Sequence, residues 1–475
     1  MSELPSGWSS SPLSEVCRIV RGVTYNKSQA SDLPNDGMVP VLRANNIQPP
    51  TISYDDLVFV PETCVSQDQM IIPGDIVIAM SSGSRSVVGK AAQSSSNWNG
   101  SFGAFCAVLR PSGEMHNAYI GHFCRSKSYR DRTTELAAGV NINNLKPSHF
   151  DEIEIQVAPY AEQASIAKAL DGLLAQVDTL KARLDALRPL IKNFRKSVLS
   201  AATSGELTMT WRSGNKENEP ASDYLARIEA CRKNSPTVKF KEPAKPDLEK
   251  RTIEIPLTWE IASISSFAEC LDSMRVPVKK ELRNSTAKQY PYFGANGEVD
   301  RVAEYIFDDD LVLVTEDETF YGREKPIAYR YSGKCWVNNH AHVLKAHDRT
   351  GRDFLFYSLM HYDVIPWLTG TTGRAKLTQA ALLSLPIGVP PADEQIEIVS
   401  RVEQLFAFAD QLEARLADAR QRVDALTQSI LAKAFRGEMV PQDPNDEPAS
   451  VLLERIAAQR AADPKPKRGR KAAAH

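Results

Sequence analysis

The segment from Gly83 to Lys90 is the part of this sequence that comes nearest to a phosphate-binding motif. It reads Gly-Ser-Arg-Ser-Val-Val-Gly-Lys, and glycine-rich loops that end in Gly-Lys can cradle phosphates with their backbone amides. The two glycines are one residue too far apart for that motif, and Ala91 stands where a hydroxyl would hold Mg²⁺. We therefore expect no nucleotide site in this loop.

Other catalytic and metal-binding patterns are also incomplete. His340 and His342 flank one alanine without a neighbouring cysteine or carboxylate, so a packed or hydrogen-bonded role is favoured over a zinc site. The turn Phe293-Gly-Ala-Asn-Gly297 has the wrong spacing for the cofactor turn of an amino-methyltransferase, and the sequence contains neither an Asn/Asp-Pro-Pro-Tyr/Phe loop nor a Gly-x-Ser-x-Gly elbow. The sequence thus predicts no catalytic residue, no metal site and no cofactor bound by this chain.

The composition is typical of a soluble globular protein. The chain has 475 residues, 42% of them hydrophobic and 24% charged, which is enough for two or three domains with sizeable cores. No apolar run approaches the roughly 18 to 20 residues of a membrane helix, and the N-terminus does not resemble a signal peptide, so we expect a cytoplasmic protein. The seven cysteines are scattered, which argues against a disulfide framework.

The overall charge does not favour nucleic-acid binding. The formal net charge is -2 and the isoelectric point is about 6.5, whereas nucleic-acid-binding domains are commonly basic. Local basic patches can still contact phosphates, and a partner chain could supply more positive charge. A DNA-binding function therefore needs other evidence.

That evidence starts with an internal repeat. Pro159-Tyr-Ala-Glu-Gln163 aligns with Pro391-Ala-Asp-Glu-Gln395, and an offset of 232 positions then holds without a gap for about fifty residues. The chain therefore looks like two related halves. Further matching segments are Gly205-Glu-Leu207 with Gly437-Glu-Met439, Glu219-Pro-Ala-Ser222 with Glu447-Pro-Ala-Ser450, and, more weakly, Pro5-Ser-Gly-Trp8 with Pro256-Leu-Thr-Trp259.

The repeat predicts two long helices with coiled-coil seams. Apolar residues recur in alternating steps of three and four, and a stripe this narrow suits one partner helix better than a globular core. We expect the two helices to pair with each other as an antiparallel coiled coil, and Pro189 to kink or interrupt the first near Asp185. The first seam comprises Leu170, Leu173, Val177, Leu180, Leu184, Leu187, Ile191, Phe194 and Val198, and the second Val402, Leu405, Ala409, Leu412, Leu416, Ala419, Val423, Leu426 and Ile430.

The predicted fold class is α+β, with two mixed α/β heads separated and followed by the two long helices. The heads contain short strands, such as residues 75–80 and 311–315, between Gly, Asn and Ser turns. The expected segments are an N-terminal head (1–158), a central long helix (159–210), a linker with a short helix (211–250), a C-terminal head (251–390), a distal long helix (391–440), and a short helix with a basic disordered tail (441–475).

The motifs of the repeat resemble those of a known family. The Pro-x-x-Glu-Gln helix start, the Ala-x-x-Gly-Glu-Leu/Met helix end and the Pro-x-x-Trp opening are similar to the specificity (S, HsdS) subunits of type I restriction-modification systems. The resemblance covers nearly the whole chain and is strongest in the helical repeats. In the heads, which the family calls target recognition domains, it is looser and includes residues 39–47, 73–77 and 369–377.

The resemblance implies a non-catalytic DNA reader that takes part in phage defence. Each head would read one half of a bipartite, asymmetric DNA site, and the helices would set the spacer between the halves. Two adenine-N6 methyltransferase (M) subunits would dock on this chain, and restriction (R) subunits would then join. S-adenosylmethionine would be bound by the methyltransferase partner, and ATP and Mg²⁺ by the restriction partner.

Polar loops in the heads are the candidate DNA contacts. Arg, Asn and Ser side chains can read base edges, while Lys and Arg on phosphates set the register; for each loop, a solvated turn is the alternative. Arg374 and Lys376 are favoured because the family has a basic segment there. The candidates are Arg43, Asn45, Asn46, Ser81, Ser82, Ser84, Arg85, Lys90, Asn97 and Asn99 in the first head, and Asn296, Arg323, Lys325, Asn338, Asn339, His340, Arg374 and Lys376 in the second.

Two alternatives stay open at this point. The tail at residues 463–471 resembles an AT-hook that could enter the minor groove, but it is also typical of a solvated end with non-specific phosphate attraction. The whole chain could instead be a coiled-coil scaffold that presents two protein-binding heads and has no DNA role. Equal heads with exposed apolar patches would favour the scaffold, and unlike heads with Arg- and Asn-bearing loops favour the DNA reader.

Overall fold

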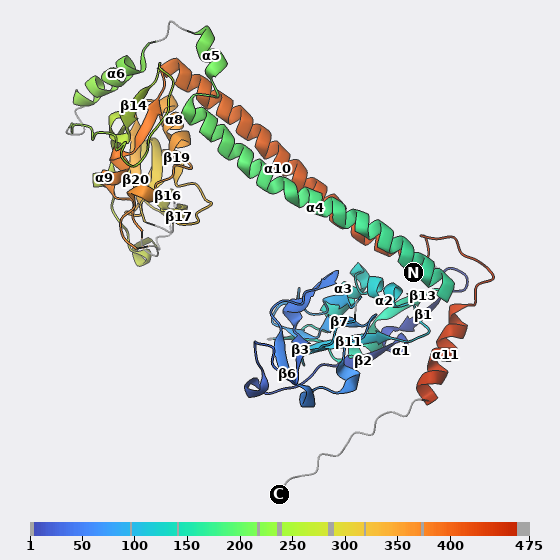
Figure 1. Cartoon of the computed structure of the whole chain (residues 1–475). Coiled ribbons are helices and arrows are strands. Elements are labelled where there is room, and N and C mark those ends of the chain that lie inside the picture. Colours follow the sequence, from blue (N-terminus) through green and yellow to red (C-terminus); the bar gives the residue numbers. More distant parts are fainter. Residues whose placement is uncertain are drawn as a thin grey trace. The chain divides into compact units, whose positions relative to one another are not determined.

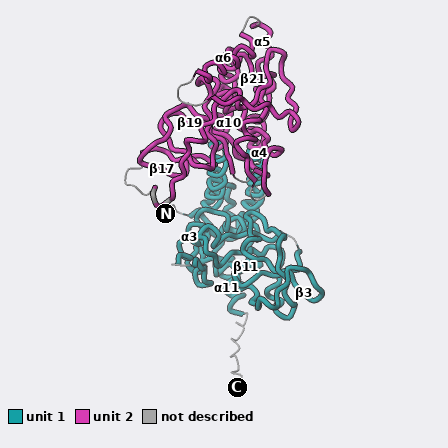
Figure 2. The backbone as a smooth tube through the Cα atoms, turned by 90° about the vertical axis from the view of Figure 1, so that its left-hand side faces the viewer, with its two compact units in different colours: residues 1–185, 418–475 teal, residues 186–417 magenta. Residues whose placement is uncertain are grey.

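The structure is a computed structural model of the chain. It describes residues 4–95, 97–139, 142–215, 219–234, 240–283, 289–317, 320–371 and 375–462. The chain divides into unit 1, residues 1–185 and 418–475, and unit 2, residues 186–417 (Figure 2). The boundaries fall at Ala186 and Asp418, which the offset of 232 makes equivalent. Each unit therefore contains one head and parts of both long helices.

The two predicted long helices are α4 (Tyr160–Ser204) and α10 (Ala392–Ala434). α4 continues through Pro189, so the alternative that this proline interrupts the helix is wrong. A proline removes one backbone hydrogen bond and crowds the preceding turn, but residues 185–190 are all exposed, so no packed neighbour restricts how the helix accommodates the ring.

α4 and α10 lie side by side and antiparallel within each unit (Figure 1). In unit 1, Lys181 pairs with Asp424 at 2.8 Å and Asp185 with Arg420 at 2.8 Å. In unit 2, Arg195 donates to the carboxylate of Asp410 at 2.6 Å. Partner numbers fall as residue numbers on α4 rise, which is the antiparallel order that the repeat predicts.

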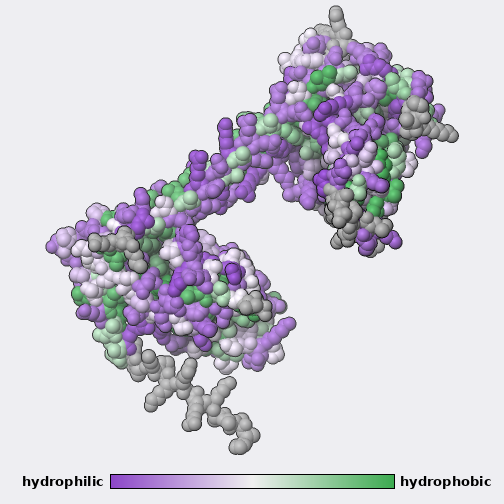
Figure 3. Space-filling model, turned by 180° about the vertical axis from the view of Figure 1, so that it is seen from behind, coloured by the Kyte–Doolittle hydropathy of each residue, from purple (hydrophilic) through white to green (hydrophobic). Residues whose placement is uncertain are grey.

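Pairing buries only one row of each seam. Leu170, Val177 and Ala409 are at most 3% exposed, whereas Leu173 and Leu180 are 39% and 45% exposed. Two helices cover only the residues that face each other or a head, so a second row of leucines stays in contact with solvent. Apolar residues lie between hydrophilic ones along the surface of the long helices (Figure 3).

The first head is built on two small sheets. A four-stranded antiparallel sheet has the order β2-β11-β7-β9, and a three-stranded sheet has the order β10-β3-β6. Helices α2 and α3 pack with the core that α4 and α10 enter through Ile166, Leu170 and Leu431. The bounds are α1 (Leu13–Val16), β2 (Cys17–Arg21), β3 (Met38–Leu42), β4 (Ile47–Gln48), β5 (Thr51–Ile52), β6 (Val58–Pro61), β7 (Ile76–Ala79), β8 (Ser81–Ser82), β9 (Ala91–Gln93), β10 (Ser101–Phe102), β11 (Cys106–Pro111), α2 (Asn117–Phe123), α3 (Lys127–Leu136) and β12 (Asn143–Asn144).

The second head is built on a different, larger sheet. Six strands run in the order β15-β20-β18-β19-β16-β17, and α8 packs against β18, β19 and β20. The strands predicted within residues 75–80 and 311–315 are confirmed as β7 and the end of β18. The bounds are α7 (Ile264–Phe267), β15 (Ala268–Cys270), β16 (Tyr290–Gly294), β17 (Gly297–Val302), β18 (Phe307–Thr315), β19 (Ala328–Val337), β20 (Ala341–Ala346), α8 (Arg349–Leu359) and α9 (Gln379–Ser384).

A common frame surrounds these unlike sheets. In unit 1, β1 (Ser9–Pro12) pairs antiparallel with β13 (Glu154–Val157), directly before α4. In unit 2, β14 (Glu260–Ser263) pairs in the same way with β21 (Pro386–Val389), directly before α10. Trp8 and Trp259, which open the two halves, are both buried. The repeat in the sequence is therefore a repeat of the frame.

The segment after each long helix packs in the unit of the other head. The segment after α4, which follows the first head, belongs to unit 2, and the segment after α10, which follows the second head, belongs to unit 1. Gly205, which ends α4, lies against Pro256 of unit 2, and Gly437, which follows α10, lies against Pro5 of unit 1. Both glycines have positive φ, 80° and 72°, as a helix stop requires. The segments beyond them contain α5 (Met209–Gly214) and α6 (Ala221–Lys233) in unit 2 and α11 (Ala449–Ala462) in unit 1.

Candidate nucleic-acid interface

The loop after β3 carries the first candidate residues. Asn46 is buried, and its side chain accepts from the backbone N–H of Arg43 at 2.8 Å and donates to the carbonyl of Asp55 at 2.7 Å. The Arg43 guanidinium donates to the Asp56 carboxylate at 2.7 Å, and the Asn45 amide donates to the same carboxylate at 3.1 Å. Asn46 thus holds the loop in shape, while Arg43 and Asn45 offer polar groups to solvent.

Arg130 of α3 holds the loop after β7 in place through hydrogen bonds to its backbone. Its guanidinium donates to the carbonyls of Val88 and Ser86 at 2.9 and 3.1 Å, and β8 pairs with β12. Lys90 leads into β9, whereas a phosphate cradle needs the N-terminus of a helix at that point, so this loop does not have the architecture of a P-loop. Among the candidates here, Ser84 and Arg85 are exposed, and Ser81, Ser82 and Lys90 are half-buried.

The third polar loop of the first head lies beside the first. The ring of Trp98 packs on Tyr54, with centroids 5.0 Å apart, and this contact leaves Asn97 and Asn99 exposed on either side. Tyr54 belongs to the segment that holds the Arg43 loop. The structure therefore brings two of the three polar loops together.

Sequence reasoning missed Phe105, which is 70% exposed. The backbone N–H of Met80 donates to the carbonyl of Phe105 at 2.8 Å, and the N–H of Gly103 donates to the carbonyl of Leu42 at 2.9 Å. These bonds bring the loops after β3, β7 and β10 to one edge of the head. An aromatic residue in a Gly-Ala-Phe turn between two strands was the available signal.

In the second head, candidates from separate loops converge. Asn296, Asn338 and His340 line a shallow hollow of about 430 Å³ at the edge of the six-stranded sheet. Arg323 reaches the same place and donates to the Asn296 side-chain oxygen at 2.7 Å. The backbone of Lys376 forms a β-bridge with that of Asp317, which also lines the hollow. We call these five candidate residues, Asn296, Arg323, Asn338, His340 and Lys376, the second-head cluster.

The members of the second-head cluster differ in solvent exposure and in the hydrogen bonds that they make. Asn338 is buried, and its side-chain oxygen accepts from the backbone N–H of His340 at 2.8 Å. His340 is exposed and its Nδ1 lies 2.7 Å from the Asp317 carboxylate. The neighbouring Asn339 and Lys325 are exposed. Arg374 lies outside the described residues.

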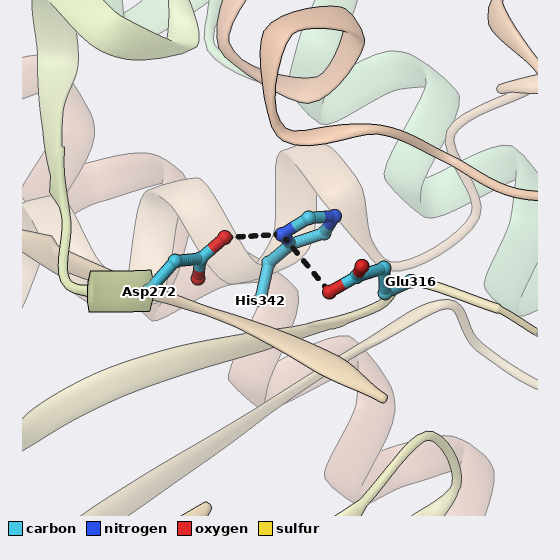
Figure 4. Close-up of side chains that lie close together, drawn as sticks. All are labelled: Asp272, Glu316 and His342. Atoms are coloured by element: carbon cyan, nitrogen blue, oxygen red, sulfur yellow. Dashed lines mark hydrogen bonds and ion pairs between the residues drawn. The ribbon is translucent and has the colours of Figure 1, made fainter. Parts of the chain in front are cut away.

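A buried ionic network adjoins the cluster through Lys376, and Figure 4 shows three of its members, Asp272, Glu316 and His342. His342 is fully buried, with Nδ1 2.6 Å from the Asp272 carboxylate and 3.7 Å from Glu316. Glu316 also pairs with Arg275 at 2.5 Å and with Lys376 at 2.7 Å. Through Glu316, the network holds Lys376 at the rim of the hollow.

The charges in this network stabilise one another. Burial alone would raise the pKa of Asp272, but the hydrogen bond and charge of His342 outweigh it and hold that pKa below its ordinary value. Burial likewise opposes ionisation of Glu316, yet hydrogen bonds from Lys376 and Arg275 lower its pKa. The hydrogen bond to Glu316 raises the pKa of Lys376.

This network is better explained as a structural one than as a metal centre. Asp272, Glu316 and His342 offer ligand atoms within 4.8 Å of one another, but Arg275 and Lys376 already pair with Glu316. Moreover, His342 Nε2 lies 2.8 Å from the Leu377 carbonyl. A cation there would have to displace the ammonium and guanidinium groups. Both histidines of the pair are hydrogen-bonded, as expected: the buried His342 to Asp272 and the exposed His340 to Asp317.

Comparison with known proteins identifies the family. A family model for the type I restriction modification DNA specificity domain matches residues 5–188 and 256–419. These two matches cover more than half of the chain, and each contains one head and the beginning of the long helix that follows it. The chain therefore belongs to the family of type I restriction-modification specificity (S, HsdS) subunits.

Individual relatives match the chain from end to end. It is 38% identical over 488 residues to the StySPI specificity subunit of Salmonella potsdam, with 99% of each chain covered. It is 36% identical over 507 residues to the EcoKI specificity subunit of Escherichia coli (strain K12), again with 99% of each covered.

A solved structure has the same fold. A chain from a study of complex assembly and conformational transition of the type I R-M system superposes with a TM-score of 0.61 at 18% identity, covering 92% of this chain and all of that one. Among the described residues, we find no helix that is long and apolar enough to cross a membrane.

Proposed function

We propose that this chain reads a bipartite, asymmetric DNA site, with one head for each half. The observation that carries the proposal is the presence of two unlike sheets in a repeated frame, each with exposed Arg-, Asn- or Lys-bearing loops at one edge. Equal heads related by a twofold axis would suit a symmetric site, whereas unlike heads suit two different half-sites. The long helices that join the units would set the spacer.

The loops have the chemistry that base reading requires. Asn side chains can bind adenine with two hydrogen bonds, Arg can bind guanine in the same way, and an exposed aromatic ring can contact a thymine methyl group. In the first head, Asn45, Asn97, Asn99 and Phe105 are exposed, and in the second head Asn296 and Asn339 are exposed. Equal heads with exposed apolar patches would favour the scaffold alternative, whereas the two heads have different sheet orders.

We further propose that catalysis belongs to partner chains. Two adenine-N6 methyltransferase subunits would dock on this chain and bind S-adenosylmethionine, and restriction subunits would join with ATP and Mg²⁺. The complex would act in the cytoplasm, where its DNA lies. The exposed second row of seam residues supports docking on the helices, because a contiguous apolar row on a soluble protein commonly marks a partner interface.

Leu180→Glu is expected to abolish stable association with the methyltransferase subunit while leaving the fold intact. Leu180 is 45% exposed, so a carboxylate there meets solvent in the free chain but would be buried without a partner in an interface. Co-purification from cells that express both subunits measures the effect. Ala182→Glu, an exposed position about 200° further round α4, is the matched control; equal co-purification of both variants would contradict docking on this row.

The function itself is tested by methylation mapping. Single-molecule sequencing would compare host DNA with and without this gene, in the presence of its methyltransferase partner. Loss of N6-methyladenine from one split, asymmetric motif is the expected result. If no motif changed in cells shown to contain the complete complex, the scaffold function would replace the DNA reader.

Variants of the two heads should change different halves of that motif. Asn339→Ala is expected to relax base preference in one half-site and Asn45→Ala in the other, because each removes a side chain that can read a base edge, at about 1–3 kcal/mol of discrimination. The same methylation mapping reads out both variants, and each serves as the control for the other. Relaxation of the same half by both variants would overturn the assignment of one head to each half.

A further inference from the structure

A basic cleft lies within unit 2, between the second half of α4 and the head. It encloses about 440 Å³. One wall is α4, which contributes Lys196, Ser200 and Thr203, and the opposite side includes Arg251 and the loop that carries Arg323 and Lys325. We call this feature the α4 cleft.

The α4 cleft carries an excess of positive charge. Lys196, Arg251, Arg323 and Lys325 line it, and Asp363 is the carboxylate among the described lining residues. The positive field is felt by His361, which also lines the cleft. Its pKa is lowered by partial burial and then by the charges of Lys196 and Lys192.

The cationic groups of the cleft are differently engaged. The Arg251 guanidinium stacks over the Tyr362 ring, 4.3 Å from its centroid, and this contact holds the group at the cleft. At the rim, Lys192 pairs with Glu324 at 2.6 Å. Lys196 is exposed one turn further along α4. The cleft therefore has strong donors on both walls.

The internal repeat shows that this cleft is not required by the frame. The offset of 232 makes Lys196 equivalent to Gln428 and Thr203 equivalent to Phe435. In unit 1, Phe435 fills the corresponding space and packs on Tyr119 with ring centroids 5.0 Å apart. Unit 2 has small hydroxyl residues and a lysine there instead. The lysine and the hydroxyl group that α4 contributes to the cleft are thus not repeated at the equivalent positions, Gln428 and Phe435.

Arg323 connects the cleft with the second-head cluster. Arg323 lines the cleft and also donates to Asn296 in the hollow at the sheet edge. A ligand that contacts the cluster would therefore extend past Arg323 and Lys325 toward the cationic groups of the α4 cleft.

We propose that the α4 cleft binds backbone phosphates of the duplex DNA whose bases the second head reads. This inference rests on the proposed function and adds a phosphate-binding site on the long helix itself. Lysine ammonium groups, guanidinium edges and Ser or Thr hydroxyls are the groups that proteins use against phosphate oxygens. The site would set the register of the duplex and would not discriminate between bases.

Lys196→Gln tests the proposal by its effect on salt dependence. Loss of one phosphate contact should lower the slope of log K against log salt by about 0.9 and weaken binding about fivefold near 0.1 M salt. Fluorescence anisotropy measures the affinity of the complete complex for two duplexes. One contains the motif identified by methylation mapping, and the other contains a scrambled version of it. Both affinities should fall by a similar factor, and the methylation motif in cells should stay unchanged.

Lys433→Gln is the matched control, because Lys433 is an exposed lysine at the end of the other long helix. Thr203→Val, which removes a hydroxyl without a charge, is the second variant and should weaken both duplexes with no change of slope. If Lys196→Gln matched the wild type, or if Lys433→Gln weakened binding equally, the α4 cleft would be excluded while the DNA reader stood. A wild-type complex that bound neither duplex would overturn the proposed function as well.

Discussion

Replacing Glu394 by glutamine is expected to destabilise unit 2 by about 3 kcal/mol. Glu394 lies at the start of α10, is 1% exposed, and accepts hydrogen bonds from Thr208 at 2.7 Å and from Arg212 Nη2 at 2.8 Å. Removing one member of a buried ion pair leaves the other charge uncompensated, at a cost of about 3–5 kcal/mol. The lower value applies because an amide still accepts a hydrogen bond and Arg212 keeps some solvent contact.

The effect should be measured within unit 2. A single melting temperature would mix the two units, so hydrogen exchange of peptides from β14 and β21 is the better readout. The double variant Glu394→Gln with Arg212→Gln should recover part of the loss, because it removes both charges. If the double variant were less stable than Glu394→Gln alone, the ion pair would not be the cause.

The equivalent residue of the first half provides the control. Glu162 is also buried, but its carboxylate accepts from the neutral Trp8 indole at 2.9 Å. Burial raises its pKa, and the hydrogen bond from Trp8 offsets only part of that rise. A carboxyl whose pKa is raised by folding binds its proton more tightly in the folded state, so its ionisation costs stability as the pH rises through that pKa.

Glu162→Gln should therefore leave unit 1 equally stable or more stable at pH 7. In the wild type, ionisation of Glu162 lowers the stability of unit 1 as the pH rises from acidic to neutral, and the variant should lack this decrease. Hydrogen exchange of β1 and β13 peptides at pH 5 and pH 7 compares the variant with the wild type. A loss as large as that of Glu394→Gln would show that Glu162 has a cationic partner in solution.

Asp272→Asn is expected to destabilise the second head by about 3–5 kcal/mol at neutral pH. Asp272 accepts from His342 at 2.6 Å and from the backbone N–H of Val343 at 2.9 Å. Asp272 also pairs with the Arg275 guanidinium at 3.2 Å, and the second ring nitrogen of His342 lies 2.8 Å from the Leu377 carbonyl. An asparagine would take from the largely buried Arg275 one of the two carboxylates that it pairs with, and would leave Glu316 as the other.

The pH dependence identifies the cause. Because folding lowers the pKa of Asp272, its stabilisation is present above the unfolded value near 3.8 and is lost as the pH falls through the folded value. The difference between wild type and Asp272→Asn should therefore shrink on acidification. Denaturant unfolding at pH 7 and pH 3, monitored by exchange of β18 and β20 peptides, measures it.

Asp309→Asn is the matched control for this prediction. Asp309 lies on the same sheet and pairs with Lys345, but both side chains are more than a third exposed, and exposed pairs contribute at most about 1 kcal/mol. If both variants lost the same stability at pH 7, removal of any carboxylate from the sheet would have the same effect, and the buried network would contribute no more than an exposed ion pair.

The parts of the fold that depend on local patterns could be predicted. The spacing of apolar residues located α4 and α10, and Gly205 and Gly437 marked their ends, because helices are governed by interactions within a few residues. The strands at residues 75–80 and 311–315 were visible as short apolar runs. Of the two effects expected of Pro189, a kink or an interruption, the interruption was wrong, because packing along the rest of α4 outweighs one missing backbone hydrogen bond.

The candidate site could be predicted only in outline. Loop composition singled out Arg43, Asn45 and Asn46 together, but it could not show that Asn46 is buried and Asn45 exposed. Phe105 went unnoticed because its exposure depends on contacts with strands from elsewhere in the head. The hydrogen bond of His342 is made to Asp272, which is 70 residues away, and no local pattern carries that information.

The sequence by itself determined that this chain is a twofold repeat with two long helices and two unlike heads, because repetition and heptad spacing can be read directly from residue types. Only the tertiary structure decided that each head is closed by the segment after the other's helix, that Glu394 has a cationic partner and Glu162 a neutral one, and that one row of seam leucines faces solvent. These features depend on which distant side chains share a low-dielectric interior. Burial and pairing at long range are set by the folded chain as a whole.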